Sequence, residues 1–330
     1  MPSYNSPELI HAPLAPTMLT DLPPELLEKI ALLASLDGSG RTAASLRLVS
    51  RYVSAVAEPY TFYCISVHGP QMMSRLCNDI GNASFKARNN CRHLLMSDVA
   101  EDVLRKLEAR NTPVDSSLDI FYSPGHGASD LMLALLKVVA PTLETFTLLI
   151  YDGSTLVYER ILSVKYPLLR NFHIHLRSLA LIRRLDRKLH LPALHSLHVS
   201  FAFVADRHNM DMAINFLTTI RAENLASAQL SGVRNSSISV DGLRSTVGES
   251  YHAYAGLADP GPLAPSVQQL LVQAIMSPTI LFGNPLKYLT NELSTRSDQR
   301  FVVLPETMGM TYETCRDEWT KSLGAFGDST

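Results

Sequence analysis

Three histidines are the residues of this chain whose spacing could support metal binding or proton chemistry. His173 and His175 lie two positions apart in a segment of alternating apolar residues, and His198 occupies the position matching His173 in the next such segment. If the two segments form neighbouring strands, about 4.8 Å apart, the three imidazoles lie together on one face. Such a group could bind zinc or make recognition pH-sensitive. Because no acidic or cysteine ligand accompanies them in the pattern, we expect polar residues on a solvated sheet, with no metal and no cofactor.

The rest of the sequence offers little catalytic chemistry. It contains no GxSxG, HExxH, P-loop or GxGxxG motif, and its one Gly/His/Ser cluster, YSPGHGASD at residues 122–130, is better explained as the start of a helix. The four cysteines, Cys64, Cys77, Cys91 and Cys315, have no CxxC spacing, so we expect free thiols. We therefore expect this protein not to be an enzyme.

The amino-acid composition excludes several further classes of protein. With 46% hydrophobic residues, 18% charged residues and a formal net charge of -2, the chain is neither a basic nucleic-acid binder nor a disordered tail. Residues 1–18 contain four prolines and no Lys or Arg, which predicts a disordered tail and not a signal peptide. No run approaches ~18 apolar residues, so we expect no membrane span and a location in the cytoplasm or nucleus.

The histidines belong to a pattern that recurs along the chain: an apolar residue, two others, an apolar residue, one other, and an apolar residue. The clearest copies are LETFTL, LRNFHI, LHSLHV and LASAQL, which begin at Leu143, Leu169, Leu194 and Leu225. Weaker copies begin at Cys91 and Asp115, and CISV at residues 64–67 is a further candidate. Helical periodicity at 130–141 and 178–189 precedes two of the copies. These features predict an irregular α/β solenoid of about six units.

The recurring pattern resembles a degenerate leucine-rich repeat, because Tyr151, Arg177 and Ala202 stand where that repeat usually has Asn or Cys. Alternation along each strand then places two columns of side chains on the face opposite the core. These columns are Leu95, Asp119, Thr147, His173, His198 and Gln229, and Ser97, Phe121, Leu149, His175, Ser200 and Ser231. We expect this face to be exposed and to bind a target through Phe121, Leu149, His173, His175 and His198.

The first ordered segment is expected to be three short helices. Pro24 suits the first turn of a helix, and a glycine-containing loop at 37–40 ends it. Apolar residues recur every three or four positions over 43–56, where Ser50 offers a break into two helices. A unit of about 45 residues is near the size at which a chain needs help to bury enough surface, so it requires a partner.

The residues of this segment resemble the F-box motif of mushroom-forming fungi. The resemblance rests on LPxELL at 22–27 and Ile30, followed by LRLVS at 46–50 and then Arg51, Ala55, Ala57 and Pro59. Val53 departs from the motif, since an aromatic residue often stands there. The resemblance implies docking to the Skp-type adaptor of an SCF (cullin–RING) ubiquitin ligase. The residues it places against the adaptor are Leu22, Pro23, Leu26, Ile30 and Val49. Without such docking, the same helices would simply cap the rest of the chain.

The end of the chain departs from the repeat. We expect a loop insert near 232–264, helices near 266–276 and 285–293, a strand at 300–305, and a closing helix with Tyr312, Cys315 and Trp319 on one face. The predicted organisation is thus a tail (1–18), an F-box-like helical domain (19–66) and a repeat domain (67–330) closed by a strand-helix cap. The predicted function is substrate recognition for the ligase, with an unknown target protein and no nucleic-acid or membrane partner. The alternative is an interaction scaffold without ligase association.

Overall fold

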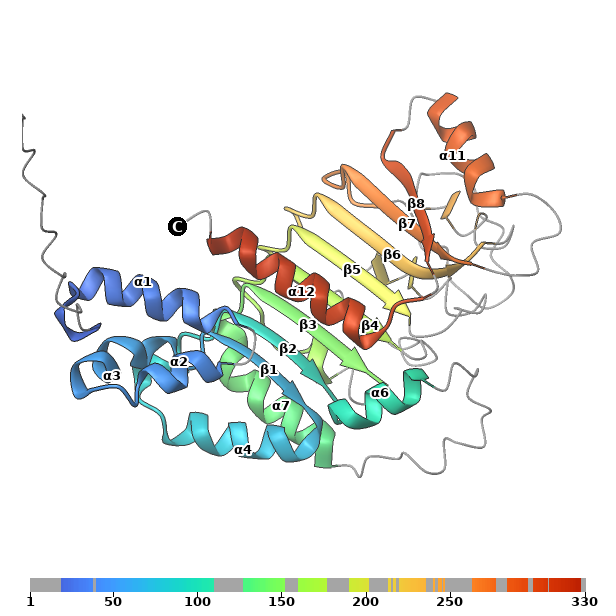
Figure 1. Cartoon of the computed structure of the whole chain (residues 1–330). Helices are drawn as coiled ribbons and strands as arrows, with labels where there is room; N and C mark the ends of the chain where they lie inside the picture. Colours follow the sequence, from blue (N-terminus) through green and yellow to red (C-terminus); the bar gives the residue numbers. More distant parts are fainter. Residues whose placement is uncertain are drawn as a thin grey trace, which may run out of the picture.

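A computed structural model of the chain shows a mixed α/β protein built on one parallel sheet (Figure 1). The residues that it describes are 19–37, 40–109, 127–151, 160–176, 190–201, 213–214, 216–217, 220–235, 240, 243–244, 246, 263–276, 284–295, 299–307 and 309–327. The predicted tail at 1–18 and the predicted helix at 178–189 lie outside these ranges. Within them, every helix is too short or too polar to cross a membrane.

The N-terminal helices form where the sequence predicts them. They are η1 (Leu19–Asp21), α1 (Pro24–Ser35), α2 (Arg41–Leu46), α3 (Arg51–Ala57) and η2 (Glu58–Tyr60). Asp37 caps α2, because its carboxylate accepts hydrogen bonds from the backbone N–H groups of Gly40 and Thr42. Ser50 separates α2 from α3, and its hydroxyl oxygen accepts from the N–H of Val53 at 3.2 Å. The predicted break at Ser50 is confirmed.

Eight parallel strands follow, and each pairs with the next strand along the chain. They are β1 (Cys64–His68), β2 (His93–Ser97), β3 (Thr145–Ile150), β4 (Asn171–Leu176), β5 (Ser196–Phe201), β6 (Ser227–Arg234), β7 (Gln269–Ile275) and β8 (Phe301–Thr307). The strands predicted from CISV, from the four clear copies, from the copy at Cys91 and from 300–305 are therefore confirmed. The expected domain boundary at residue 66 falls inside β1.

The copy predicted at Asp115 and Phe121 lie outside the described residues, within which β2 pairs directly with β3. Two predictions for the body of the chain need correction. Residues 269–275 form strand β7 and not a helix, because the strand continues the ladder beside β6. The expected loop insert at 232–264 is partly wrong, since its start completes β6 and Val240 and Leu243 are buried.

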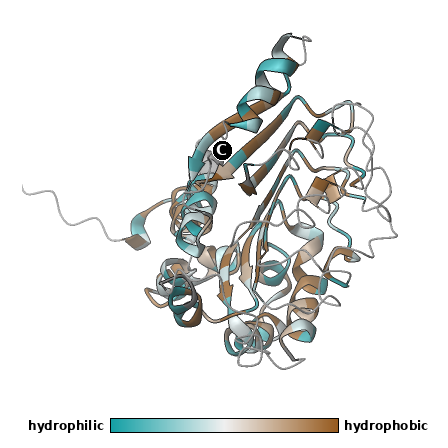
Figure 2. Cartoon of the chain, turned by 90° about the vertical axis from the view of Figure 1, so that its right-hand side faces the viewer, coloured by the Kyte–Doolittle hydropathy of each residue, from teal (hydrophilic) through white to brown (hydrophobic). Residues whose placement is uncertain are grey.

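One face of the sheet packs on helices and forms the main core. Alternate strand residues, such as Phe146, Ile174 and Leu230, are buried there. The helices that supply buried residues to this core include α4 (Gly69–Asn82), α7 (Gly127–Val139) and α11 (Pro285–Thr295), together with η4 (Ala140–Thr142). The short helix α5 (Phe85–Arg88) follows α4, whereas α6 (Glu101–Ala109) contributes Leu104 to a second cluster. Figure 2 shows mainly hydrophobic colour on the strands and mixed colour on the helices, as expected for a sheet between covering layers.

The closing helix, α12 (Tyr312–Gly327), lies on the opposite face of the sheet across the middle strands (Figure 1). Its buried residues Tyr312, Cys315 and Trp319 share one side, as predicted. They pack into a second cluster with Leu95 of β2 and Leu149 of β3. The helix therefore covers the sheet and does not cap its end, which corrects the expected position of this element.

Candidate functional site

The N-terminal helices divide their apolar residues between an inner and an outer surface. Leu27, Ala31 and Val53 are buried among the three helices. Leu26 of α1 is 48% exposed, and Val49, just before α3, is 54% exposed. Of the other residues expected to face an adaptor, Pro23 is exposed, whereas Leu22 and Ile30 are half-buried. All five retain accessible surface in the isolated chain.

Further apolar side chains add to this outer surface. Leu33 is 60% exposed, Leu48 is 87% exposed and Tyr52 is 41% exposed. Leu33 shares the helical stripe of Leu26 and Ile30, so the sequence carried a signal for it, whereas nothing in the pattern distinguished Leu48 from a buried leucine. We call Leu26, Leu33, Leu48, Val49 and Tyr52 the outer apolar surface. Several large exposed apolar side chains on one small helical unit favour an interaction site.

The second candidate surface is the sheet face under α12, and its register is as predicted. The pairing places Leu95, Thr147, His173, His198 and Gln229 in one row and Ser97, Leu149, His175, Ser200 and Ser231 in the next. The prediction that this whole face is exposed is wrong for the earlier strands of the sheet, which α12 covers. Leu149 and His175 are fully buried, so neither is accessible to a target while α12 is in place.

The physical reason for this burial is the apolar stripe of α12. Trp319 is 3% exposed and Cys315 is 0% exposed, so that helix needs an apolar surface of its own to cover. Leu95 and Leu149 supply such a surface on the sheet. On β6 to β8 the same face is half-buried at Gln229, Leu271, Val302, Gln273 and Leu304, although Ser231 of β6 is fully buried.

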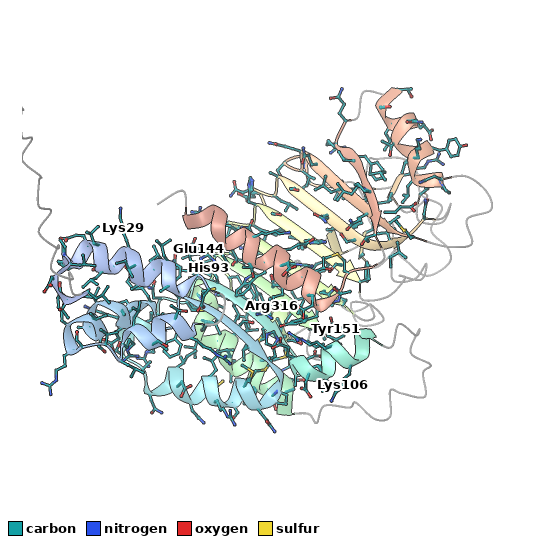
Figure 3. All side chains as sticks on the ribbon, in the orientation of Figure 1. Lys29, His93, Lys106, Glu144, Tyr151 and Arg316 are labelled. Carbon is teal, nitrogen blue, oxygen red and sulfur yellow. The ribbon has the colours of Figure 1, made fainter. Side chains whose placement is uncertain are left out.

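Polar contacts also join α12 to the sheet and to α6. The Tyr312 hydroxyl lies 3.3 Å from Nε2 of His68 on β1, and the Arg316 guanidinium donates to Glu101 of α6 at 3.3 Å. Figure 3 shows Arg316 on the side of α12 near α6, while Lys29 points from α1 away from the sheet. Arg105 pairs with Glu313 at 3.2 Å. These contacts fix the direction in which α12 crosses the strands.

The three predicted histidines come together on β4 and β5. The rings of His173 and His198 are stacked, with centroids 4.0 Å apart and 13° between their planes. Nε2 of His173 and Nδ1 of His175 each lie 2.8 Å from the Ser200 hydroxyl oxygen. Nε2 of His198 lies 2.9 Å from the hydroxyl oxygen of Ser231. Serine hydroxyls on the neighbouring strand thus orient all three rings.

An acidic partner that the sequence pattern did not show is Glu318 of α12. Its Oε2 atom lies 3.5 Å from Nδ1 of His198, and a ligand atom from each of His173, His198 and Glu318 can be chosen so that all lie within 4.8 Å of one another. Glu318 precedes Trp319, and no periodicity linked it to the histidines. The strand pattern contains no acidic residue beside the histidines, and the structure supplies one from a distant helix.

Burial controls the protonation of this group. It lowers the pKa of His173 to about 3, and burial with repulsion from His173 lowers the pKa of His175 to about 3. The pKa of His198 is also well below its usual value, first because of burial and then because of the two neighbouring histidines. Burial raises the pKa of Glu318, and Lys321 partly opposes that shift. At neutral pH the three imidazoles are uncharged.

The four cysteines all lie among the described residues and form no disulfide with one another, and Cys64, Cys91 and Cys315 are buried. No family model, curated protein or solved structure matches this chain. Its class is therefore defined by its own architecture: a mixed α/β protein with a sequentially ordered parallel sheet, a small helical unit at one end and a helix crossing the open face. The two candidate surfaces are the outer apolar surface and the half-buried sheet face of β6 to β8.

Proposed function

We propose that this protein is a substrate-recognition subunit of an SCF-type (cullin–RING) ubiquitin ligase. The N-terminal helices bind the Skp-type adaptor, and the sheet that follows them in the chain binds a target protein. The chain has no catalysis of its own in this role. It acts by proximity, because tethering a target beside the ubiquitin-transferring subunits raises its effective concentration.

The observation that carries the proposal is the outer apolar surface. Leu26, Leu48 and Val49 are about half exposed or more, although Leu27 and Val53 next to them are nearly fully buried. A helical unit that had only to cap the sheet would turn its largest apolar side chains inward. Exposed leucines that coincide with the F-box-like positions therefore favour a protein partner over a cap.

The order of the strands supports the second half of the proposal. Eight parallel strands that pair strictly in chain order, with helices on one face, are typical of a solenoid assembled from α/β units such as leucine-rich repeats. Solenoids of this kind present a long surface for binding other proteins. Because α12 covers the first half of the open face, we assign target binding to Gln229, Leu271, Gln273, Val302 and Leu304 in place of Leu149 and His175.

A binding assay with purified full-length protein and a Skp-type adaptor tests the first half. We expect a complex on size-exclusion chromatography, and we expect the double variant Leu26→Glu, Val49→Glu to weaken it by at least about tenfold, since each substitution places a charge in an apolar contact. The matched control is Leu168→Glu, because Leu168 has a similar exposed fraction, 42%, and lies before β4. The control variant is expected to bind like the wild type.

Two outcomes would contradict the ligase role. If the wild-type protein forms no complex with the adaptor, the chain is an interaction scaffold without ligase association. If the double variant binds as well as the wild type, docking does not use the outer apolar surface. Circular dichroism of each variant shows whether a loss of binding reflects a loss of folding.

A further inference from the structure

We propose that His173, His198 and Glu318 form a binding site for one divalent transition-metal ion of the zinc class, which joins α12 to strands β4 and β5. The three residues come from three elements, and their ligand atoms all lie within 4.8 Å of one another. Two imidazoles and one carboxylate are a donor set that zinc uses in proteins, with a fourth position left for water.

The serine contacts orient the histidines for metal binding. A serine hydroxyl has one proton, so Ser200 can donate to Nδ1 of His175 while it accepts from Nε2–H of His173. In the same way, Ser231 can accept from Nε2–H of His198 as well as from the side-chain amide of Gln229 at 3.0 Å. Both rings then carry a lone pair on Nδ1. An outer hydrogen bond that fixes the tautomer in this way is a regular feature of metal-binding histidines.

Stacking makes the two Nδ1 atoms face the same side. The rings of His173 and His198 are only 13° from parallel, and both turn Nε2 toward a serine on the following strand. Nδ1 of His198 is the atom that faces Glu318. The Nδ1 atom of His173 therefore lies on the same side. Because each lone pair lies in the plane of its ring, metal binding would tilt the two rings out of their stack so that both Nδ1 atoms point at one ion.

The distance to Glu318 fits a shared metal better than a direct hydrogen bond. The separation of 3.5 Å between Oε2 and Nδ1 of His198 exceeds the usual N–H···O length of about 2.7–3.2 Å. Ligand atoms about 2.0–2.2 Å from a tetrahedral ion are roughly 3.3–3.5 Å apart. Among the described residues, Lys321 on the same helix is the cation that influences this carboxylate. A metal ion would supply the positive charge on the sheet side.

The donor set also selects the kind of metal. Imidazole nitrogen suits Zn²⁺, Co²⁺ and similar ions, whereas Mg²⁺ and Ca²⁺ require mostly oxygen ligands. Binding would hold α12 to the sheet at a point beyond the apolar cluster of Leu95 and Leu149. This inference concerns the α12 contact alone and does not depend on adaptor binding.

The test uses untagged full-length protein, treated with a chelator and then titrated with Zn²⁺ or Co²⁺ in a calorimeter, with Mg²⁺ as the comparison. We expect one Zn²⁺ or Co²⁺ ion per chain and no response to Mg²⁺. Trp319, the single tryptophan of the chain, follows Glu318 directly, so its fluorescence is expected to change on binding. Metal is also expected to raise the melting temperature, since a ligand of the folded state stabilises it.

The decisive variant is Glu318→Gln, which keeps the size of the side chain and removes its charge. We expect its Zn²⁺ affinity to fall at least tenfold, while Asp317→Asn, which changes an exposed neighbouring acid, leaves the affinity unchanged. Cys77→Ser removes the only cysteine that is not fully buried and is also expected to bind normally. Because Glu318 is half-buried at the edge of the helix, its variant is expected to fold, and circular dichroism checks this.

Any of three results would overturn the inference. Wild-type protein that takes up no Zn²⁺ or Co²⁺ has no such site. Equal affinity of wild type and Glu318→Gln would place the metal elsewhere, and so would loss of binding in Cys77→Ser.

Discussion

Truncation of Trp319 gives the sharpest measure of how firmly α12 is attached. Only 3% of this residue is exposed, so nearly its whole indole surface is removed from water by packing against the sheet. An aromatic side chain of this size buries roughly 200 Å², which at about 25 cal/mol per Å² corresponds to an upper value near 5 kcal/mol. We expect Trp319→Ala to lower the free energy of unfolding by about 3–5 kcal/mol.

A second substitution at the same position separates packing from polarity. Nε1 of Trp319 is buried without a hydrogen-bond partner among the described residues. An unsatisfied buried donor costs about 1–3 kcal/mol, and Trp319→Phe removes that cost together with part of the apolar surface. We therefore expect the free energy of unfolding of Trp319→Phe to lie within about 1.5 kcal/mol of the wild-type value and to be well above that of Trp319→Ala.

Urea unfolding followed by far-UV circular dichroism measures both variants, because neither retains a tryptophan for fluorescence. Tyr288→Ala on α11 is the control, since Tyr288 is 70% exposed and its truncation is expected to change stability by less than about 0.5 kcal/mol. A loss below about 1 kcal/mol for Trp319→Ala would refute the packing of α12 on the sheet. The target face assigned here would then have to include Leu149 and His175.

Three further predictions concern other parts of the fold. Leu27→Ala is expected to lower the free energy of unfolding by about 2–5 kcal/mol, because Leu27 is 2% exposed. Leu33→Ala on the same helix should change it little, because Leu33 is 60% exposed. Thermal unfolding compares the two variants. Burial lowers the pKa of His68 to about 4. The free energy of unfolding is therefore unaffected by this residue above about pH 6.5. It falls by up to about 3 kcal/mol as the pH drops toward 4, because the unfolded chain binds the proton more readily. Urea unfolding at several pH values should show a smaller loss for His68→Gln, and an unchanged profile would contradict the assignment. Gly232 has a φ of 83° at the bulge in β6, and an added Cβ would lie 2.9 Å from the carbonyl oxygen of Phe201. Gly232→Ala is therefore expected to lower the melting temperature by several degrees. An unchanged melting temperature would count against the bulge.

The histidine group shows where reasoning from sequence alone stops. Strand alternation correctly predicted that His173, His175 and His198 share a face, because side-chain direction in a strand has a period of two. It could not predict Glu318, since α12 reaches the histidines only through the path of the chain after β8. It also could not predict the burial of His175, because a strand pattern does not say what will cover its second face.

The N-terminal helices show the opposite case. Their starts and breaks are set by local rules, namely Pro24 at a first turn and Ser50 as a cap, so the sequence predicted them closely. The helix expected at 266–276 failed because a short apolar run fits either a helix or a buried strand, and only the ladder beside β6 selects the strand.

What the sequence determined by itself was therefore local: the positions of the strands other than β7, the faces of those strands and of the helices, and the helix caps. Each depends on residues within a few positions of one another. The tertiary structure alone decided where those faces meet. The stripe of Tyr312, Cys315 and Trp319 predicts that α12 must be covered, but burial of apolar surface has no preferred direction and many surfaces would satisfy it. In the structure α12 packs on the sheet around Leu95 and Leu149, where it covers half of the open face and places Glu318 beside His198.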